Sequence, residues 1–225
     1  MNRFFVQEKV NEHFILSPET LKHLKVIRAE NKQFICIYQD EFYLCQLENQ
    51  KAKIIEKILN NHENPFEIVL AISIIKLERF EWMLQKATEL GVSTIIPMDT
   101  TFCNTDLIKY KFDKKLERFK TILQNAAEQS FRNKIPTLAP IHTFDQALNY
   151  PINHKYLAHE KINISQRLNS QIDHACMFFI GPEGGFSDQE IEQAKTKNVE
   201  IISLGSRILR AETAALYLLS QVKMY

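Results

Sequence analysis

Glycine is scarce in this chain, and it is concentrated in two short segments. Five glycines occur in 225 residues, and four of them lie between Gly181 and Gly205. Average usage is about 7%, so the chain avoids glycine except in this region. Glycine permits a positive φ angle and lets a ligand approach the main chain closely. An ordinary turn would explain one such glycine, but four together predict a ligand site built from backbone.

The two segments, FIGPEGGFSDQE (179–190) and IISLGSRILRAETAA (201–215), fit neither common nucleotide motif. No G-K-[ST] follows the first segment, which excludes a phosphate-binding P-loop, and its G-x-x-G-G spacing differs from the G-x-G-x-x-G of dinucleotide sites. Apolar side chains accompany the glycines, namely Ile180, Leu204, Ile208 and Leu209. Together the segments predict a binding site for a flat, neutral-to-cationic ligand, formed by main-chain groups and these side chains.

The elements that must position this binding site are strands of an α/β domain. ACMFFI (175–180) predicts a buried strand, and Ser187 with Glu190 predicts a capping box that begins a helix. From residue 66 to residue 225, apolar strands alternate with amphipathic helices, which predicts a mostly parallel sheet. Open sheets of this kind bind ligands at the carboxyl ends of their strands. Both glycine segments are expected at such ends.

The first 60 residues have a different pattern. RFFV, QFICIYQ, FYLCQLE and KAKIIEKIL predict short strands, and SPETLKHLKVIRA predicts one helix with Ser17 as N-cap and Pro18 in the first turn. Residues 1–60 are therefore predicted to form a small β-rich domain. NNHENP (60–65) consists of polar and breaker residues, which indicates a linker.

Composition limits the choice of compartment and partner. The net charge is +1. The segment 107–134 carries eight basic and three acidic residues, and most of its lysines are interpreted as lying on a solvated helix face. The four cysteines form no C-x-x-C pair, and no secretory signal or membrane-length apolar run is found, so we expect a cytoplasmic protein with reduced thiols and no membrane contact. The histidines lack metal-ligand spacing, and no metal is expected.

Four blocks of the sequence resemble one known family. FIGPEGGFSDQEI, LGSRILRAETAAL, QKATELGVSTIIP and NAAEQSFRNKIP are similar to signature blocks of the bacterial 16S ribosomal RNA uridine N3-methyltransferases, members of the SPOUT class. The resemblance implies a PUA-like β-barrel domain followed by an α/β domain with a deep trefoil knot. It also implies a homodimer, S-adenosylmethionine as methyl donor, and 16S rRNA in the 30S subunit as substrate. The knot rests on the resemblance alone, because knots are essentially absent from most folds.

The chemistry implied is attack of uridine N3 on a sulfonium methyl, and N3 must first lose its proton. Arg132 is expected to stabilise the developing anion, since a guanidinium stays charged and offers a fork of donors; a phosphate contact or salt bridge is the alternative. Glu128 or Glu212 is expected to accept the proton. For Glu212 the alternative is a carboxylate at the N-terminus of the last helix. Arg210 is expected to hold a phosphate or the cofactor carboxylate.

The remaining site residues follow from the same resemblance. The cofactor site is expected to comprise Leu157, Ile180, Gly181, Gly184, Gly185, Leu204, Gly205, Ile208, Leu209 and Thr213. His159 and Glu160 end another strand and are expected to line this site. The alternative for His159 is a buried structural histidine. RNA contacts are expected from Arg3, Lys25 and Arg28. Phe131 departs from the family, which usually has a small residue, often glycine, before the arginine.

Two other functions share parts of this pattern. A methyltransferase acting on another RNA site would keep every one of these features. The base that is methylated depends on the shape of the pocket and of the RNA, and it cannot be read directly from the amino-acid sequence. A non-catalytic RNA-binding protein would keep the β-rich domain and basic segment but would not need glycine loops at two strand ends. The low net charge predicts weak affinity for free RNA and recognition of a structured particle.

Overall fold

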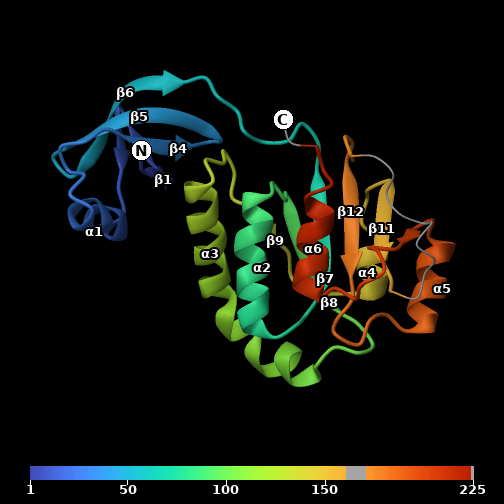
Figure 1. The fold of residues 1–225 in the computed structure, drawn as a ribbon. Helices are drawn as coiled ribbons and strands as arrows, with labels where there is room; N and C mark the ends of the chain where they lie inside the picture. The colour runs from blue at the N-terminus through green and yellow to red at the C-terminus, as the bar shows by residue number, and fades with distance from the viewer. Residues whose placement is uncertain (161–170, 224–225) are drawn as a thin grey trace. The chain divides into compact units, whose positions relative to one another are not determined.

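The computed structural model describes residues 1–160 and 171–223, and the chain divides into two compact units (Figure 1). Unit 1 comprises Met1–Glu63 and Gln124–Ile135, and unit 2 comprises Asn64–Leu123 and Pro136–Tyr225. The division differs from a single boundary near residue 60, because a second stretch of chain returns to unit 1. That stretch contains the end of helix α3 (Leu116–Gln129) and the turn after it.

Unit 1 is built on a six-stranded sheet in the order β1-β4-β5-β6-β3-β2. Strands β1 and β4 are parallel, and the other neighbours are antiparallel. The strands are β1 (Arg3–Phe5), β2 (Lys9–Val10), β3 (His13–Ile15), β4 (Phe34–Tyr38), β5 (Glu41–Glu48) and β6 (Lys51–Ile58). Helix α1 (Pro18–Val26) begins as expected, with the Ser17 side chain accepting from the Thr20 amide at 3.1 Å.

Local turn chemistry fixes the register of unit 1. Gln39 and Asp40 have φ angles of 50° and 64°, and Asn49 and Gln50 have φ angles of 49° and 63°. Two consecutive positive φ angles define the type I′ hairpin turn, whose twist matches that of the flanking strands. The β4–β5 and β5–β6 hairpins therefore form without glycine. Phenylalanines fill the core beneath them, including the fully buried Phe14 and Phe34.

Unit 2 contains, among its described residues, a seven-stranded sheet in the order β10-β8-β7-β12-β11-β13, with β9 also paired to β8. Every neighbouring pair is parallel, which confirms the predicted α/β class with a parallel sheet. The strands are β7 (Ile68–Ser73), β8 (Thr94–Asp99), β9 (Thr137–Leu138), β10 (His142–Thr143), β11 (His154–Ala158), β12 (Cys176–Ile180) and β13 (Glu200–Ile202).

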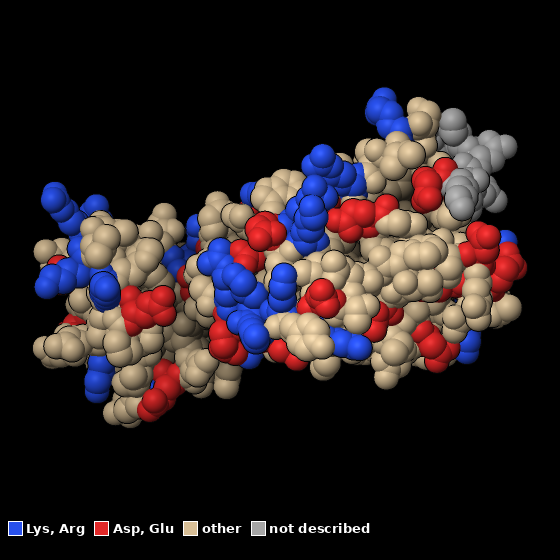
Figure 2. Space-filling view, turned by 90° about the horizontal axis from the view of Figure 1, so that it is seen from below, with Lys and Arg blue, Asp and Glu red and all other residues tan. Residues whose placement is uncertain are grey.

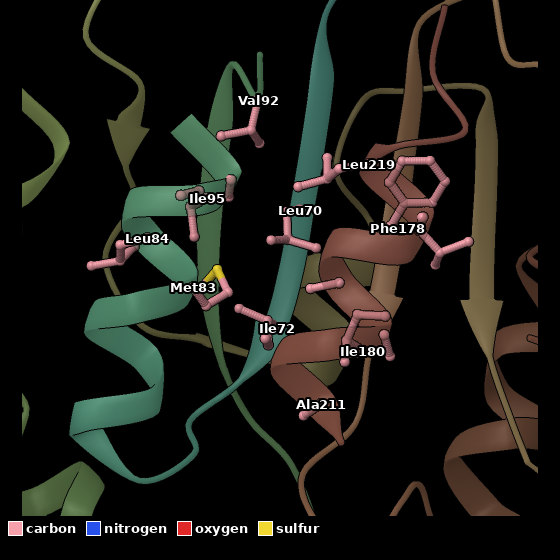
Figure 3. Packing of buried hydrophobic residues seen from close by; sticks show 14 of the residues in the cluster. Leu70, Ile72, Met83, Leu84, Val92, Ile95, Phe178, Ile180, Ala211 and Leu219 are labelled. Atoms are coloured by element: carbon pink, nitrogen blue, oxygen red, sulfur yellow. The ribbon is translucent and has the colours of Figure 1, made fainter. Parts of the chain in front are cut away.

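Helices cover both faces of this sheet, so its central strands are buried throughout. Leu70 and Ile72 of β7 pack with Met83 of α2 (Leu77–Glu89) and Leu219 of α6 (Ala211–Leu219), as Figure 3 shows. Alternate residues of β7 face the other way, toward α4 (Phe144–Leu148) and α5 (Asp188–Thr196). The six residues of β7 are all buried as a result, which explains the continuous apolar run in the sequence.

The helix ends explain most of the positive φ angles outside the hairpins. Arg28, Gly91, Phe131 and Asn198 each follow a helix with φ between 52° and 83°. In each case the next residue donates its amide to a carbonyl five residues earlier, as Arg132 does to Ala127 at 3.0 Å. This is the Schellman arrangement, in which glycine is the favoured residue. Gly91 follows α2 with a glycine at this position, whereas the other three helices use side-chain-bearing residues.

Several short elements were not predicted from the sequence. They are β2, β3, β9, β10, α4, the π-helical turn η1 (Leu107–Lys111) and the 3-10 turn η2 (Asp113–Lys115). Strands of two or three residues and helices of five are too short to show a hydrophobic period. Helix α3 begins at Leu116, directly after η2.

All four cysteines are free thiols. Over residues 1–160 and 171–223, each helix is too short or too polar to cross a bilayer. Within the same described ranges, no group of three or more His, Cys, Asp or Glu side chains is arranged to hold a metal ion.

Candidate functional site

A cavity of about 370 Å³ opens in unit 2 at the carboxyl ends of β11, β12 and β13. The strands bring Ala158, Ile180 and Leu204 to its walls, and the start of α6 closes it with Ala211 and Ala214. The full lining is Arg79, Ala158, His159, Glu160, Ile180, Gly181, Pro182, Glu183, Gly184, Gly185, Phe186, Leu204, Gly205, Arg207, Ile208, Leu209, Arg210, Ala211 and Ala214. Both glycine segments therefore meet at one pocket.

The glycines of the first segment are required by the packing of the loop on itself. A Cβ on Gly181 would lie 3.1 Å from the Gly185 carbonyl carbon and 3.2 Å from the Phe186 ring. A Cβ on Gly184 would lie 3.0 Å from the Cβ of Phe102. Gly185 and Gly205 have φ angles of 72° and 121°, which side chains of L residues rarely permit. The loop is thus folded tightly enough to present main-chain groups to the cavity.

Helix α5 fixes the far end of this loop. The Ser187 side chain accepts from the Glu190 amide at 3.3 Å, and the Glu190 carboxylate accepts from the Ser187 amide at 2.8 Å. This is the predicted capping box. The other oxygen of Glu190 accepts from the Thr101 amide at 2.9 Å. The same buried carboxylate therefore anchors both the glycine loop and the loop that follows β8.

Charged groups of both signs surround the cavity. Arg79 of α2 lies 3.5 Å from a carboxylate oxygen of Glu183 and 3.9 Å from one of Glu212. Arg207 and Arg210 are exposed and form no ion pair with a residue that the structure describes. Their guanidinium groups are free to bind an anionic group of a ligand, while Glu183 lies on the wall as a counterion for a cationic one.

His159 is the least satisfied buried side chain of the pocket. It is 7% exposed, and its Nδ1 makes no hydrogen bond to a described residue, although a Glu160 oxygen lies 3.6 Å away. The His159 amide donates to the Ile202 carbonyl at 3.0 Å, so the backbone is held between β11 and β13. A buried polar atom without a partner is costly in a finished core. At a pocket wall it is suited to meet a ligand.

The structure brings most of the expected cofactor residues together. Ile180, Gly181, Gly184, Gly185, Leu204, Gly205, Ile208 and Leu209 line the cavity, and so does Arg210. Leu157 does not, because strand alternation turns it to the opposite face, where it packs in the α4–α5 core. Thr213 does not either, because it lies on the exposed side of α6 between the lining residues Ala211 and Ala214.

Some lining residues were not proposed from the sequence. Pro182, Glu183, Phe186 and Arg207 lie inside the two glycine segments, so proximity to the glycines could have indicated them. Arg79 comes from the first turn of α2, far away in sequence, and no local signal marks it. His159 and Glu160, expected either at the site or in the core, are part of the lining.

Arg132, the expected anion stabiliser, belongs to unit 1 and is paired there. Its side chain is 5% exposed, and its guanidinium donates to both oxygens of Glu63, through Nε at 3.2 Å and through Nη2. The same carboxylate accepts from the amides of Asn133 at 2.9 Å and Lys134 at 3.1 Å. Residues 60–65, expected as a linker, therefore supply a partly buried ionic partner for the buried Arg132 at the end of α3.

Glu128, one of the two expected proton acceptors, is also in unit 1. Its Oε1 accepts from the Phe5 amide at 3.1 Å and from Gln124 Nε2 at 3.0 Å. Burial raises the pKa of this carboxyl above its ordinary value, and the two hydrogen bonds oppose that shift. Glu212, the other candidate, is buried in the first turn of α6 beside Arg79.

The residues expected to contact RNA differ in how they are engaged. Arg3 donates to the Gln129 carbonyl at 2.9 Å, and its guanidinium lies 4.9 Å from the centre of the Phe131 ring. Lys25 and Arg28 are exposed at the end of α1. Phe131, the departure from the family pattern, has a φ of 63° and packs against Phe42 with ring centres 4.8 Å apart.

Comparison with known proteins assigns this chain to a family. Residues 62–223, which include the whole cavity lining, match the family of RNA methyltransferase domains. The ribosomal RNA small subunit methyltransferase E of Mesomycoplasma hyopneumoniae (strain 232) is 44% identical over 98% of this chain and 98% of its own length. The crystal structure of that enzyme from Neisseria gonorrhoeae, bound to S-adenosylmethionine, is 30% identical with a TM-score of 0.85, covering 98% of this chain and 95% of that chain. A methyltransferase from Legionella pneumophila, in complex with the same cofactor, is 31% identical with a TM-score of 0.83, covering 97% of this chain and 95% of that chain.

The parallel sheet and its glycine-lined pocket thus define a protein of the RNA methyltransferase class. Within that class the chain belongs to the ribosomal RNA small subunit methyltransferase E family, because the 44% identity extends through both compact units.

Proposed function

We propose that this chain transfers a methyl group from S-adenosylmethionine to ribosomal RNA of the small subunit. The observation that carries the proposal is the pocket of unit 2, in which two glycine loops, an apolar wall and the exposed Arg207 and Arg210 meet at the ends of parallel strands. Relatives with this fold are named for that activity, and two of them were crystallised with the cofactor.

The residues of the pocket fit S-adenosylmethionine group by group. Leu204, Leu209 and Ile180 offer apolar surface for a flat base. Arg207 and Arg210 can bind a carboxylate, since guanidinium and carboxylate form charge-assisted hydrogen bonds. Glu160 and Glu183 place negative charge near a cationic ligand, and the unpaired nitrogen of His159 offers one further hydrogen bond. When bound, the cofactor supplies the methyl group and a sulfonium leaving group.

The acceptor atom we propose is N3 of a uridine in 16S rRNA. This nitrogen holds a proton at neutral pH, so the protein must remove it and stabilise the anion that remains. We assign anion stabilisation to Arg132, whose guanidinium is oriented by Glu63 before the substrate arrives, as electrostatic catalysis requires. The charge on Glu63 offsets part of this effect.

Proton removal is assigned to Glu128 or Glu212. Glu128 has the raised pKa that improves a carboxylate as a proton acceptor near neutral pH. Glu212 lies in the cofactor unit, but Arg79 and the start of α6 already stabilise its charge. Glu128 is therefore the first candidate and Glu212 the second. Arg210 is assigned to the cofactor carboxylate or an RNA phosphate.

Several finer features follow from the same proposal. The loops after β12 and β13 are proposed to form a trefoil knot, and unit 1 is proposed to be a PUA-like RNA-binding domain with Lys25 and Arg28 toward RNA. We also propose a homodimer, working in the cytoplasm on the assembled small subunit. A dimer would let unit 1 of one subunit act with the pocket of the other.

The test is mass spectrometry of ribosomal RNA from cells with and without the gene. We expect one N3-methyluridine in 16S rRNA to disappear on deletion and to return with the wild-type gene. Loss of a different modified nucleotide would mean that the chain methylates another RNA site. An unchanged set of modifications, together with no binding of S-adenosylmethionine, would leave only an RNA-binding role.

A further inference from the structure

We propose that residues 102–114 of unit 2, here called the aromatic–lysine segment, bind single-stranded RNA beside the target nucleotide. The inference rests on the proposed function, since it names how that RNA is held. The segment contains the exposed rings of Phe102 and Tyr110 and the exposed lysines 109, 111 and 114.

Phe102 packs against Gly184, one of the glycines that line the cavity. Its Cβ is 3.0 Å from the place where a Cβ on Gly184 would stand, so the backbone of the glycine loop runs against it. The side chain is nevertheless 54% exposed, whereas phenylalanine is among the residue types that are most often fully buried. An exposed aromatic ring next to the glycine loop offers a stacking surface for a base.

The position of Phe102 is fixed by its neighbours. The Thr101 amide donates to Glu190 at 2.9 Å, the Thr101 hydroxyl lies 3.3 Å from that of Ser187, and the Cys103 amide donates to the Thr100 carbonyl at 3.0 Å. Glu190 also caps α5 at the end of the glycine loop. The ring is thus carried by the same hydrogen-bond network that shapes the cofactor pocket, and it is held in place before any ligand binds.

The basic part of the segment is also anchored with its charges outward. Phe112 is 1% exposed and packs against Phe80 and Phe119, with ring centres 5.4 and 5.1 Å apart. On either side of this buried ring, Tyr110 is 63% exposed and the lysines point away from the core. In Figure 2, Lys and Arg side chains gather near the middle of the face that is seen from below.

The basic residues from Lys109 to Lys120 separate into two groups. Lys115 and Arg118 pair with Glu81, and Lys120 pairs with Glu117. Lys109, Lys111 and Lys114 make no ion pair with any residue in the described ranges. The first group is used by the fold, whereas the second group is free to neutralise phosphates. Unpaired ammonium groups next to exposed rings are the combination that single-stranded nucleic acid binds, through backbone charge and base stacking.

The test uses two sets of variants of the full chain. Phe102→Ala removes the ring, and Phe102→Trp keeps a stacking surface. Lys109, Lys111 and Lys114 are changed together to Gln, and Lys195→Gln with Lys197→Gln on the α5 side of the unit is the matched control. Binding is measured with oligouridylate and with small ribosomal subunits from cells that lack the gene, over a range of salt concentrations. Calorimetry with S-adenosylmethionine checks the cofactor site in each variant.

We expect Phe102→Ala to weaken RNA binding by about fivefold to a hundredfold, and Phe102→Trp to restore it. The triple lysine variant should lower the magnitude of the log–log salt slope by about 2, since each phosphate contact on a single strand contributes about 0.7. Both control substitutions together should leave affinity and slope unchanged. Cofactor affinity should be maintained in the triple lysine variant.

Three results would overturn the proposal. If the Phe102 variants and the triple lysine variant all keep the wild-type RNA affinity and salt slope, and the same preparations methylate small subunits, the role proposed for the aromatic–lysine segment is wrong. The methyltransferase function would be unaffected by that result. Unchanged oligouridylate binding with weakened binding to subunits would assign the segment to a ribosomal protein instead. A wild-type chain that binds the cofactor but methylates no RNA would reject the proposed function and this inference with it.

Discussion

Arg132 and Glu128 of unit 1 differ from the residues around the pocket of unit 2 in how their polar groups are satisfied. In unit 1, Arg132 is buried against Glu63, and Glu128 accepts two hydrogen bonds from its neighbours. In unit 2, Arg207 and Arg210 stand at the pocket without an ionic partner among the described residues, and the buried His159 Nδ1 is unsatisfied. Satisfied groups stabilise a fold, and unsatisfied groups next to a cavity indicate a ligand.

The largest expected effect is on the glycine loop of unit 2. Gly181→Val would place side-chain carbon within about 3 Å of Gly185 and Phe186, so the loop must move out of its present shape. We expect methyl transfer to small subunits to be abolished, measured with a labelled methyl donor at saturating RNA. Gly91→Ala is the control, because Gly91 has a φ of 83° but lies outside the cavity lining. It should lower stability by about 1 kcal/mol and leave transfer intact.

Breaking the ion pair between Arg132 and Glu63 in unit 1 should lower the stability of the folded protein. Glu63→Gln replaces the charged partner of the buried Arg132 guanidinium with a neutral amide, and losing one charge of a buried pair typically costs about 3 to 5 kcal/mol. Urea unfolding should report this loss, while calorimetry should show unchanged affinity for S-adenosylmethionine. Lys134→Gln tests the neighbouring exposed pair with Asp40, where at most about 1 kcal/mol is expected. Equal effects of both substitutions would contradict the role given to the buried pair.

Arg132 itself tests whether unit 1 contributes to chemistry as well as to folding. Arg132→Ala should reduce the single-turnover rate at saturating RNA by about 10² to 10³, since one oriented donor is lost from the transition state. Arg132→Lys should recover little of it, because a point charge cannot replace a planar fork. Higher pH should rescue part of the rate by deprotonating N3 in solution. An unchanged rate constant in the folded variant would limit Arg132 to a structural role.

The sequence predicted which glycines lie together at the pocket of unit 2, but it did not predict the partner of Arg132, and the reason is physical. Glycine clustering and strand ends are local properties, so Gly181, Gly185 and Gly205 could be placed together in advance. Ion pairing is not local, because Glu63 lies 69 positions before Arg132 and nothing in NNHENP indicates a buried carboxylate. The sequence therefore predicted Arg132 as a catalytic group but could not predict its partner.

Orientation within elements set a second limit. Leu157 lies on a predicted strand and Thr213 on a predicted helix, but each faces away from the cavity. Arg79 reaches the pocket from α2 because parallel packing brings that helix beside α6, a long-range contact without a sequence signal. The parallel sheet was predictable from its continuous apolar strands, whereas the two-residue strands β9 and β10 were not.

The smallest expected effect concerns pH and Glu128. Burial raises the pKa of this carboxyl in the folded state, so the folded protein holds its proton over a pH range in which the unfolded chain has lost it. Stability therefore falls as pH rises from the ordinary glutamate value through the raised one. Glu128→Gln should remove this part of the pH dependence, measured by urea unfolding at a series of pH values. A pH profile identical to wild type would show that Glu128 does not titrate in this way.

The most direct test of the comparison is calorimetric titration of the wild-type chain with S-adenosylmethionine. We expect one binding site per chain, because the two glycine loops, Arg207, Arg210 and His159 meet at a single cavity of unit 2. Glu63→Gln should bind with the same affinity as wild type, and Gly181→Val should not bind. Heat of dilution alone in the wild-type titration would contradict the assignment of the pocket and of the methyltransferase function that rests on it.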